Sequence, residues 1–173
     1  QRLNYVEKVR FEEVPVPGTS NQVDLNILIE EKQSGSFSVG AGIGGDGVAI
    51  DLGISQDNFL GFGSKVSFNI NTAKTSTAYG FNFYNPYHNL DSVSRSFGFN
   101  LEETKTDSER QTSSYEADRM SIDYTYGLPM TENNRFNLTL NYLSWDIRAT
   151  ERSPVEITKF IADNGSTFNN FSF

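Results

Sequence analysis

Strict alternation of bulky apolar residues with small polar residues is the feature that most constrains the fold of this chain. In residues 36–44, every odd position is apolar and every even position is Ser or Gly, which is the two-residue period of a β-strand. The same alternation recurs at residues 48–55, 66–71, 79–83, 96–101, 120–128 and 136–142, and residues 171–173 look like the start of an eighth strand. Such a chain presents one apolar face and one polar face along most of its length.

The low overall hydropathy is compatible with a membrane protein that crosses the bilayer with strands. The mean hydropathy is −0.47, and no segment approaches the ~18–20 consecutive apolar residues of a spanning helix. A tilted spanning strand needs only ~9–11 residues, of which every second one is apolar. The pattern therefore predicts an all-β fold, an antiparallel transmembrane β-barrel of which about seven to eight strands are present.

A soluble β-sandwich is the main alternative, because its strands also alternate apolar and polar residues. The outward face of a sandwich carries many Lys, Glu and Arg, whereas the second face here is Ser, Gly, Asn and Thr, and the charges lie mainly in the connectors. Aromatic residues near the segment ends, such as Tyr84, Tyr142 and Trp145, suit the aromatic girdles of a membrane barrel. The membrane barrel is the favoured interpretation.

The connectors alternate between two kinds. One set lengthens along the chain, at residues 44–47, 73–76, 102–116 and 148–170, and the other set stays short, at residues 56–63, 85–92 and 129–135. Outer-membrane barrels have short periplasmic turns at one end and longer loops at the other. Within the last long connector, apolar residues at helical spacing after Pro154 predict a short helix over residues 155–161.

Residues 1–32 differ in charge content and residue pattern from the rest of the chain. Residues 9–14 and 23–30 are strand-like and richly charged, and a loop rich in Pro and Gly joins them, which predicts a β-hairpin from a small α+β domain. Residues 33–173 then form the barrel segment. We expect the chain to be a fragment, because it opens on what looks like the tail of a helix and stops as a strand begins.

Several classes of function are disfavoured. A net charge of −8 argues against a nucleic-acid partner, and the absence of Cys removes thiolate chemistry. His88, the single histidine, is interpreted as a polar turn residue, the acidic run at residues 102–109 as a solvated loop, and residues 44–47 as a hairpin turn. No catalytic residue, metal site or cofactor is predicted, and the chain is not expected to be an enzyme.

The first barrel strand is the candidate functional surface. Gly weakens a strand interior, and an opened strand edge can pair with another strand through main-chain hydrogen bonds. The alternative is that these small residues only make room in a crowded barrel interior. The predicted pairing edge comprises Gly35, Ser36, Phe37, Ser38, Val39, Gly40, Ala41, Gly42, Ile43 and Gly44.

Specific strings in the chain resemble the BamA family of outer-membrane β-barrel assembly factors of Gram-negative bacteria. The strings are VPVPGTSNQVDLNILIEEKQSGSFSVGAGIG, then QDNFLGFG, then NPYH. The family motif in the first short turn comprises Gln56, Asp57, Asn58, Phe59, Leu60, Gly61, Phe62 and Gly63. The resemblance implies that residues 1–32 end the last periplasmic POTRA domain and that residues 33–173 form the first half of a barrel of about sixteen strands.

The same resemblance implies a function and a set of partners. Members of the family insert nascent outer-membrane proteins, whose terminal strand is thought to pair with the first barrel strand at a weak lateral gate. The implied partners are the outer-membrane bilayer, nascent outer-membrane proteins, accessory lipoproteins of the assembly complex and periplasmic chaperones. The implied location is the outer membrane, with the N-terminal segment in the periplasm. A related secretion transporter, a small pore or adhesin barrel, and a soluble β-sandwich binding module remain alternatives.

Overall fold

The computed structural model describes residues 5–19, 21–44, 47–89, 91–105, 115–131 and 134–173. The chain divides into two compact units, Gln1–Gly35 and Ser36–Phe173. In the described part of the chain, no helix is long and apolar enough to span a membrane.

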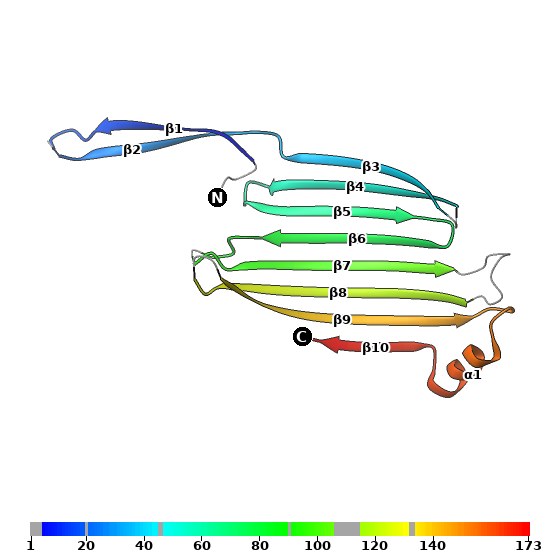
Figure 1. Cartoon of the computed structure of the whole chain (residues 1–173). Helices are drawn as coiled ribbons and strands as arrows, with labels where there is room; N and C mark the ends of the chain where they lie inside the picture. Colours follow the sequence, from blue (N-terminus) through cyan, green and yellow to red (C-terminus); the bar gives the residue numbers. More distant parts are fainter. Residues whose placement is uncertain (1–4, 20, 45–46, 90, 106–114, 132–133) are drawn as a thin grey trace. The chain divides into compact units, whose positions relative to one another are not determined.

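The first unit is an antiparallel hairpin of β1 (Val6–Pro15) and β2 (Val23–Glu31) (Figure 1). Both strands include the predicted segments. β1 is longer than the predicted 9–14 at both ends, because pairing continues from Val6 opposite Glu31 to Pro15 opposite Val23. One face pairs apolar residues, such as Phe11 opposite Ile27, and the other carries an ion pair of 3.8 Å between Lys8 and Glu30. The hairpin is therefore amphipathic.

In its described residues, the second unit is a single antiparallel meander of eight strands in which every strand pairs with its neighbours in sequence (Figure 1). The strands are β3 (Gly35–Gly44), β4 (Gly47–Phe59), β5 (Ser64–Thr72), β6 (Ser76–Asn85), β7 (Ser94–Lys105), β8 (Tyr115–Pro129), β9 (Arg135–Ala149) and β10 (Thr167–Ser172). The sheet is open, with β3 at one edge and β10 at the other. The predicted all-β fold with an antiparallel, partial barrel sheet is confirmed.

The connections sort to opposite ends of the sheet, as predicted (Figure 1). We call the end that carries the β3–β4, β5–β6, β7–β8 and β9–β10 connections the loop end, and the opposite end the turn end. The helix α1 (Val155–Asn164) lies in the β9–β10 connection at the loop end. It is longer than the predicted 155–161, and Pro154 takes its N-cap position.

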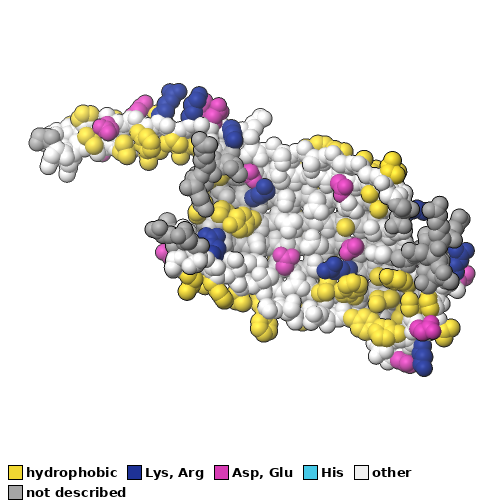
Figure 2. Space-filling model, viewed as in Figure 1, with side chains coloured by type: hydrophobic (Ala, Val, Ile, Leu, Met, Phe, Trp, Pro, Cys, Tyr) yellow, Lys and Arg dark blue, Asp and Glu magenta, His cyan; other side chains and the backbone are white. Residues whose placement is uncertain are grey.

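Register places the two kinds of alternating residue on two faces. The apolar face has a continuous cross-strand row of Ile54, Phe68, Phe81, Phe99, Ile122, Tyr142 and Phe171. The polar face has a matching row of Asp51, Asn71, Ala78, Glu102, Arg119, Trp145 and Phe168. In Figure 2 most of the middle of the sheet is white, the colour of the backbone and of uncharged polar side chains, with a few acidic and basic side chains among them.

The pattern of burial is the opposite of that in a water-soluble protein: apolar side chains are exposed, and residues of the polar face are buried. Leu140 is 56% exposed and Ile54 58% exposed on the apolar face, whereas the polar-face residues Gly80, Gly98 and Ser121 are buried. Among the described residues, the only buried hydrophobic ones are Val93 and Ala117. A sandwich would cover its apolar faces with a second sheet, and unit 2 places all eight strands in one sheet. The sandwich interpretation is therefore wrong.

Further predicted boundaries differ from the structure. β7 continues through Lys105, and β8 begins at Tyr115, so the predicted loop 102–116 is shorter; opposite charges pair there across the strands, with Glu102 facing Arg119. β10 begins at Thr167, whereas the sequence indicated a strand only from residue 171, because two adjacent Asn residues interrupt its alternation. Residues 106–114 and 45–46, which belong to the predicted acidic loop and hairpin turn, lie outside the described residues.

Candidate functional site

The predicted pairing edge coincides with β3, the edge strand of the sheet. The apolar side chains of β3 are among the most exposed in the chain, with Phe37 at 72%, Val39 at 63% and Ile43 at 88%. An edge strand presents a row of main-chain N–H and C=O groups without a neighbour on one side. β3 therefore combines a backbone hydrogen-bonding edge with a continuous apolar surface.

Among the described residues, the polar-side hydrogen bonds from side chains of β3 to β4 come from Ser36 and Ser38, in the first half of β3. The hydroxyl groups of Ser36 and Ser55 lie 2.8 Å apart, and the Ser38 hydroxyl donates to the main-chain oxygen of Gly53 at 3.4 Å. From Gly40 onward the polar side of β3 has only glycine, which offers no side chain to pack or bond.

Two glycines of β3, Gly42 and Gly44, have open space around them among the described residues, unlike most glycines of the inner strands. A Cβ added to Gly42 or Gly44 would meet no atom of a described residue within 4 Å, and one added to Gly40 would make an ordinary contact of 3.4 Å with Asp51. A Cβ on Gly80 would lie 2.5 Å from Asn69 Oδ1. Crowding thus explains the inner glycines but not Gly42 and Gly44.

The inner glycines form a system in which a polar side chain leans over the glycine of a neighbouring strand. Such a side chain would collide with an added Cβ in every case. The pairs are Ser38 over Gly53, Asn69 over Gly80, Asp123 over Gly98, and Ser94 with Asn137 over Gly127. The polar face is therefore closely packed from β4 to β9, and it is more loosely packed at the second half of β3, from Gly40 to Gly44.

The family motif at residues 56–63 is only partly a turn, which corrects the sequence prediction. β4 continues through Phe59, which pairs with Ser64, and the register shifts between Gln56 and Phe59, as in a β-bulge. The tight turn is confined to residues 60–63, where Gly61 and Gly63 adopt φ values of 78° and 67° that favour glycine.

Polar contacts fix this motif. The side-chain oxygen of Asn58 accepts a hydrogen bond of 2.7 Å from the Gly63 N–H, and Asp57 forms an ion pair of 3.2 Å with Lys65. Asn58 itself has a φ of 52°, a conformation that Asn tolerates better than most residues. The motif is a bulged strand end closed by its own side chains, so its role in the described residues is to shape the β4–β5 connection.

The apolar face forms a band that slants across the sheet. On β4 its apolar residues run from Val48 to Ile54, and on β9 from Phe136 to Tyr142, while Ile54 and Tyr142 lie in the same cross-strand row. From β4 to β9, which is five steps from strand to strand, the band thus shifts along the strands by about six residues. With ~3.4 Å per residue along a strand and ~4.8 Å between strands, this shift corresponds to a slant of ~40°. Strands of membrane barrels tilt by ~35–45°, so the band would be level in a bilayer.

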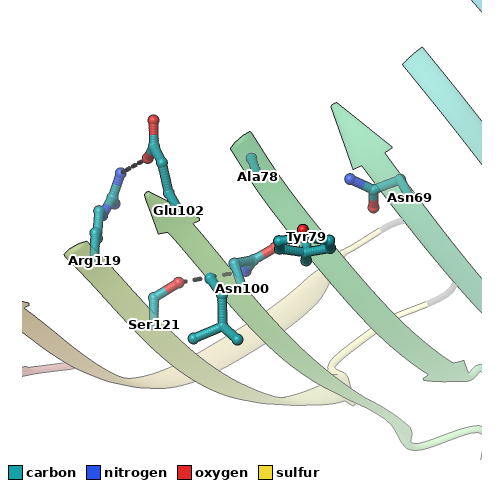
Figure 3. A pocket seen from close by; sticks show the side chains of 8 residues that line it. Asn69, Ala78, Tyr79, Asn100, Glu102, Arg119 and Ser121 are labelled. Atoms are coloured by element: carbon teal, nitrogen blue, oxygen red, sulfur yellow. Dashed lines mark hydrogen bonds and ion pairs between the residues drawn. The ribbon is translucent and has the colours of Figure 1, made fainter. Parts of the chain in front are cut away.

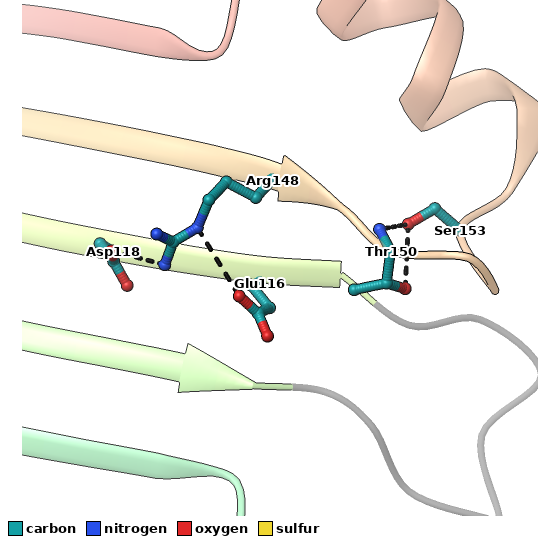
Figure 4. A network of polar contacts seen from close by, with 5 residues as sticks. All are labelled: Glu116, Asp118, Arg148, Thr150 and Ser153. Atoms are coloured by element: carbon teal, nitrogen blue, oxygen red, sulfur yellow. Dashed lines mark hydrogen bonds and ion pairs between the residues drawn. The ribbon is translucent and has the colours of Figure 1, made fainter.

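Charged residues mark the loop-end limit of the band. Glu103, Asp118 and Asp146 occupy successive positions of one cross-strand row on the apolar face, directly beyond the apolar residues Leu101 and Met120. Arg148 lies 2.7 Å from Asp118 and 3.6 Å from Glu116, as Figure 4 shows. These groups are exposed, so each pair is worth at most ~1 kcal/mol, but together they require water or head groups at this level.

The polar face holds a pocket of about 260 Å³ near the middle of the sheet (Figure 3). Its polar lining residues are Asn69, Asn100, Glu102, Arg119 and Ser121. Arg119 forms an ion pair of 3.7 Å with Glu102, and its guanidinium group lies 5.5 Å from the ring centre of Trp145. The assignment of Trp145 to a lipid-facing girdle is therefore wrong, because the ring shares the polar face with Arg119.

One open antiparallel sheet with a slanted, exposed apolar band and a polar opposite face defines a segment of an outer-membrane β-barrel. The Omp85 superfamily domain matches residues 58–173, and the chain belongs to that superfamily. The outer membrane protein assembly factor BamA of Neisseria meningitidis serogroup B is 28% identical over 169 residues, which cover 95% of this chain and 21% of that protein.

Two further comparisons agree. BamA of Buchnera aphidicola subsp. Acyrthosiphon pisum is 36% identical over 73 residues, which cover 38% of this chain and 12% of that protein. The crystal structure of BamA from Haemophilus ducreyi lacking POTRA domains 1–3 matches with a TM-score of 0.77 and 28% identity, over 100% of this chain and 34% of that chain. The resemblance to the BamA family is confirmed, and the chain spans about a fifth of the length of the Neisseria relative.

Some site residues were not predicted from the sequence. Glu102 lies in the predicted loop 102–116, and Arg119 lies just before the predicted strand 120–128. Only the register brings the two side chains together. Arg95 was also missed, because the β7 alternation was recognised only from Ser96. Extending that alternation by one residue would have placed Arg95 on the apolar face, in series with Phe97, Phe99 and Leu101.

Proposed function

We propose that this chain is part of an outer-membrane protein assembly factor that inserts nascent outer-membrane proteins and templates their strands at β3. The single observation that carries the proposal is the edge position of β3. The open space around Gly42 and Gly44 among the described residues supports it. The names of the BamA relatives support an assembly role over a pore, an adhesin or a secretion transporter.

Templating follows from the physics of an unpaired strand in a membrane. Each unsatisfied backbone group in the hydrocarbon region costs several kcal/mol, so an incoming strand enters at lower cost where a prepared edge accepts its hydrogen bonds. Main-chain pairing is largely independent of side-chain identity, which suits a factor with many clients. No covalent step is required, and the described residues contain no group of three or more potential metal ligands.

The glycine half of β3 supports a gate that opens at low cost. A strand that packs few side chains on its neighbour loses little when it separates, and Gly42 and Gly44 contribute no such packing. The crowding alternative would require atoms where their Cβ groups would lie, and the part of the chain that the structure describes places none within 4 Å. The contrast with Gly80, where an added Cβ would meet Asn69, favours the gate.

The remaining parts of the proposal concern domains and partners. Residues 1–32 are proposed to end the last POTRA domain on the periplasmic side, and residues 33–173 to form the first half of the barrel. The amphipathic hairpin of β1 and β2 supports the first assignment, since its apolar face needs a covering layer. Accessory lipoproteins and periplasmic chaperones are proposed as partners of the assembled protein.

Disulfide crosslinking in the full-length protein tests the templating edge. Cysteine at Ser38 is paired with cysteines placed along the terminal strand of an outer-membrane client, and crosslinks are measured during assembly. The control is cysteine at Ser67 on β5, an inner strand already paired on both sides. Register-specific crosslinks at Ser38 and none at Ser67 are expected. Normal insertion without crosslinks anywhere along residues 36–44 would refute templating at β3.

A further inference from the structure

Arg95 is a cation at the turn-end limit of the apolar band. It pairs with Asn85 of β6 and Tyr126 of β8, and it shares the apolar face with Phe97, two residues along β7. Phe97 and Phe83 occupy the next row of that face toward the middle of the band. Arg95 is therefore the first charged residue that the apolar face of β7 presents beyond its apolar segment on this side.

One N–H of the Arg95 guanidinium group has no acceptor among the described residues. Its Nε atom is buried and has no hydrogen-bond partner among the described residues. Its Cζ lies 5.9 Å from the ring centre of Phe83, a cation–π distance that holds the group against the sheet. A buried guanidinium N–H without an acceptor costs more than an ordinary unsatisfied group, because the donor carries charge.

The neighbours of Arg95 are hydrogen-bond donors and aromatic rings. Tyr126 brings a phenolic hydroxyl, and it lies directly opposite Arg95, where Cβ atoms are ~4.5–5.5 Å apart. The side-chain oxygen of Asn85 already accepts from the Tyr87 N–H at 3.0 Å, so its NH2 group is the donor that remains. Guanidinium, hydroxyl and amide N–H groups together suit an anion with several acceptor oxygens.

We propose that Arg95, with Tyr126 and Asn85, binds the phosphate group of a membrane phospholipid at the turn-end boundary of the apolar band. The proposal rests on the membrane placement under the proposed function and goes beyond it, because it assigns a lipid head-group site. The guanidinium fork matches phosphate oxygens bidentately. The apolar band beside the site accommodates the acyl chains, so the ligand is a lipid and not a free anion.

Lipid retention by the full-length protein tests the site. The protein is reconstituted in vesicles, released in detergent with phosphatidylglycerol, and examined by native mass spectrometry. Arg95→Gln is expected to weaken phosphatidylglycerol binding by about tenfold to a hundredfold, the effect of losing hydrogen bonds to a charged group. Arg95→Lys keeps the positive charge but loses the planar set of guanidinium N–H donors, so we expect its phosphatidylglycerol binding to lie between that of wild type and that of Arg95→Gln. The matched control is Arg135→Gln, whose guanidinium contacts Ser94 and the Ser92 main-chain oxygen.

Two comparisons identify the group that is recognised. Diacylglycerol with the same acyl chains should bind no better to wild type than to the Arg95→Gln variant, because it lacks the phosphate. Excess inorganic phosphate should not displace phosphatidylglycerol. Equal retention by wild type and Arg95→Gln would overturn the site, as would full displacement by inorganic phosphate.

Failure of the site and failure of the proposed function give different results. Insertion of the wild-type protein into vesicles is measured separately, by protection of its strands from protease. Insertion with unchanged lipid retention in Arg95→Gln would overturn the phosphate site alone. Absence of insertion would overturn the membrane placement and the site with it.

Discussion

The open space around Gly42, and the crowding around Gly80, predict opposite effects of the same substitution. Gly80→Ala would place a Cβ 2.5 Å from Asn69 Oδ1 and 2.8 Å from Asn69 Nδ2. Asn69 cannot turn freely toward its other strand partner, because Ser38 Oγ already covers Gly53. In Gly42→Ala the added methyl group would meet no atom within 4 Å among the residues that the structure describes.

The expected magnitudes follow from overpacking and chain entropy. Overpacking costs ~1–3 kcal/mol, and replacing Gly by Ala returns ~0.4–1 kcal/mol by restricting the unfolded chain. Gly80→Ala should therefore lower the free energy of unfolding by ~0.5–2 kcal/mol, whereas Gly42→Ala should raise it by ~0.4–1 kcal/mol. Neither glycine has a positive φ, so backbone strain does not enter the comparison.

The assay is guanidinium unfolding of the full-length protein in detergent, which gives the free energy of unfolding from the midpoint and slope. The client-insertion rate in vesicles is measured in parallel. Gly42→Ala should slow insertion although it stabilises the protein, because it stiffens the proposed gate. If the two variants differ by less than ~0.5 kcal/mol in stability, against the ~1–3 kcal/mol expected, the packing argument for the gate is refuted.

Three further predictions concern the apolar band and its ends. Phe99→Arg at the middle of the band should destabilise the membrane-inserted protein by ~2–4 kcal/mol and Glu103→Arg at the band limit by ~0–1 kcal/mol; equal costs in vesicle unfolding would contradict the assigned band. Arg148→Ala should lower stability by under ~1 kcal/mol, and the loss should shrink as salt rises, because its partners Glu116 and Asp118 are exposed. Phe160→Ala removes the stack on Phe168, whose ring centre is 5.4 Å away, and should speed protease cleavage near α1 while the unfolding midpoint of the sheet stays unchanged; cleavage at the wild-type rate would show that the stack does not hold α1.

The strands and their faces could be predicted from the sequence because alternation is a local signal. Each apolar run, such as Phe97 to Leu101, defines its own outward side without knowledge of its neighbours. The boundary errors came where neighbours decide. Glu102 to Lys105 read as a charged loop, and pairing with β8 makes them strand. The bulge before Phe59 likewise depends on its partner Ser64.

The candidate site likewise has features that could be predicted from the sequence and features that depend on neighbouring strands. The edge strand β3 was predicted from its glycines, but whether those glycines were crowded could not be, because crowding depends on side chains of β4 such as Asp51. Arg95 and the Glu102–Arg119 pair depend on register across three strands, which no single segment encodes. Alternation gives the face of a residue, and only pairing gives its neighbours.

The slant of the apolar band has a consequence for how the sheet finds its correct alignment. A strand that slips by two residues keeps every side chain on its proper face, so the sheet alone discriminates weakly against that error. In a bilayer the same slip shifts the apolar segment of the strand by ~7 Å along its axis, which on β7 would drive Glu103 toward hydrocarbon or expose Leu101 to water. The bilayer thus disfavours a two-residue slip in strand register, which is the register error that the alternation of faces alone tolerates.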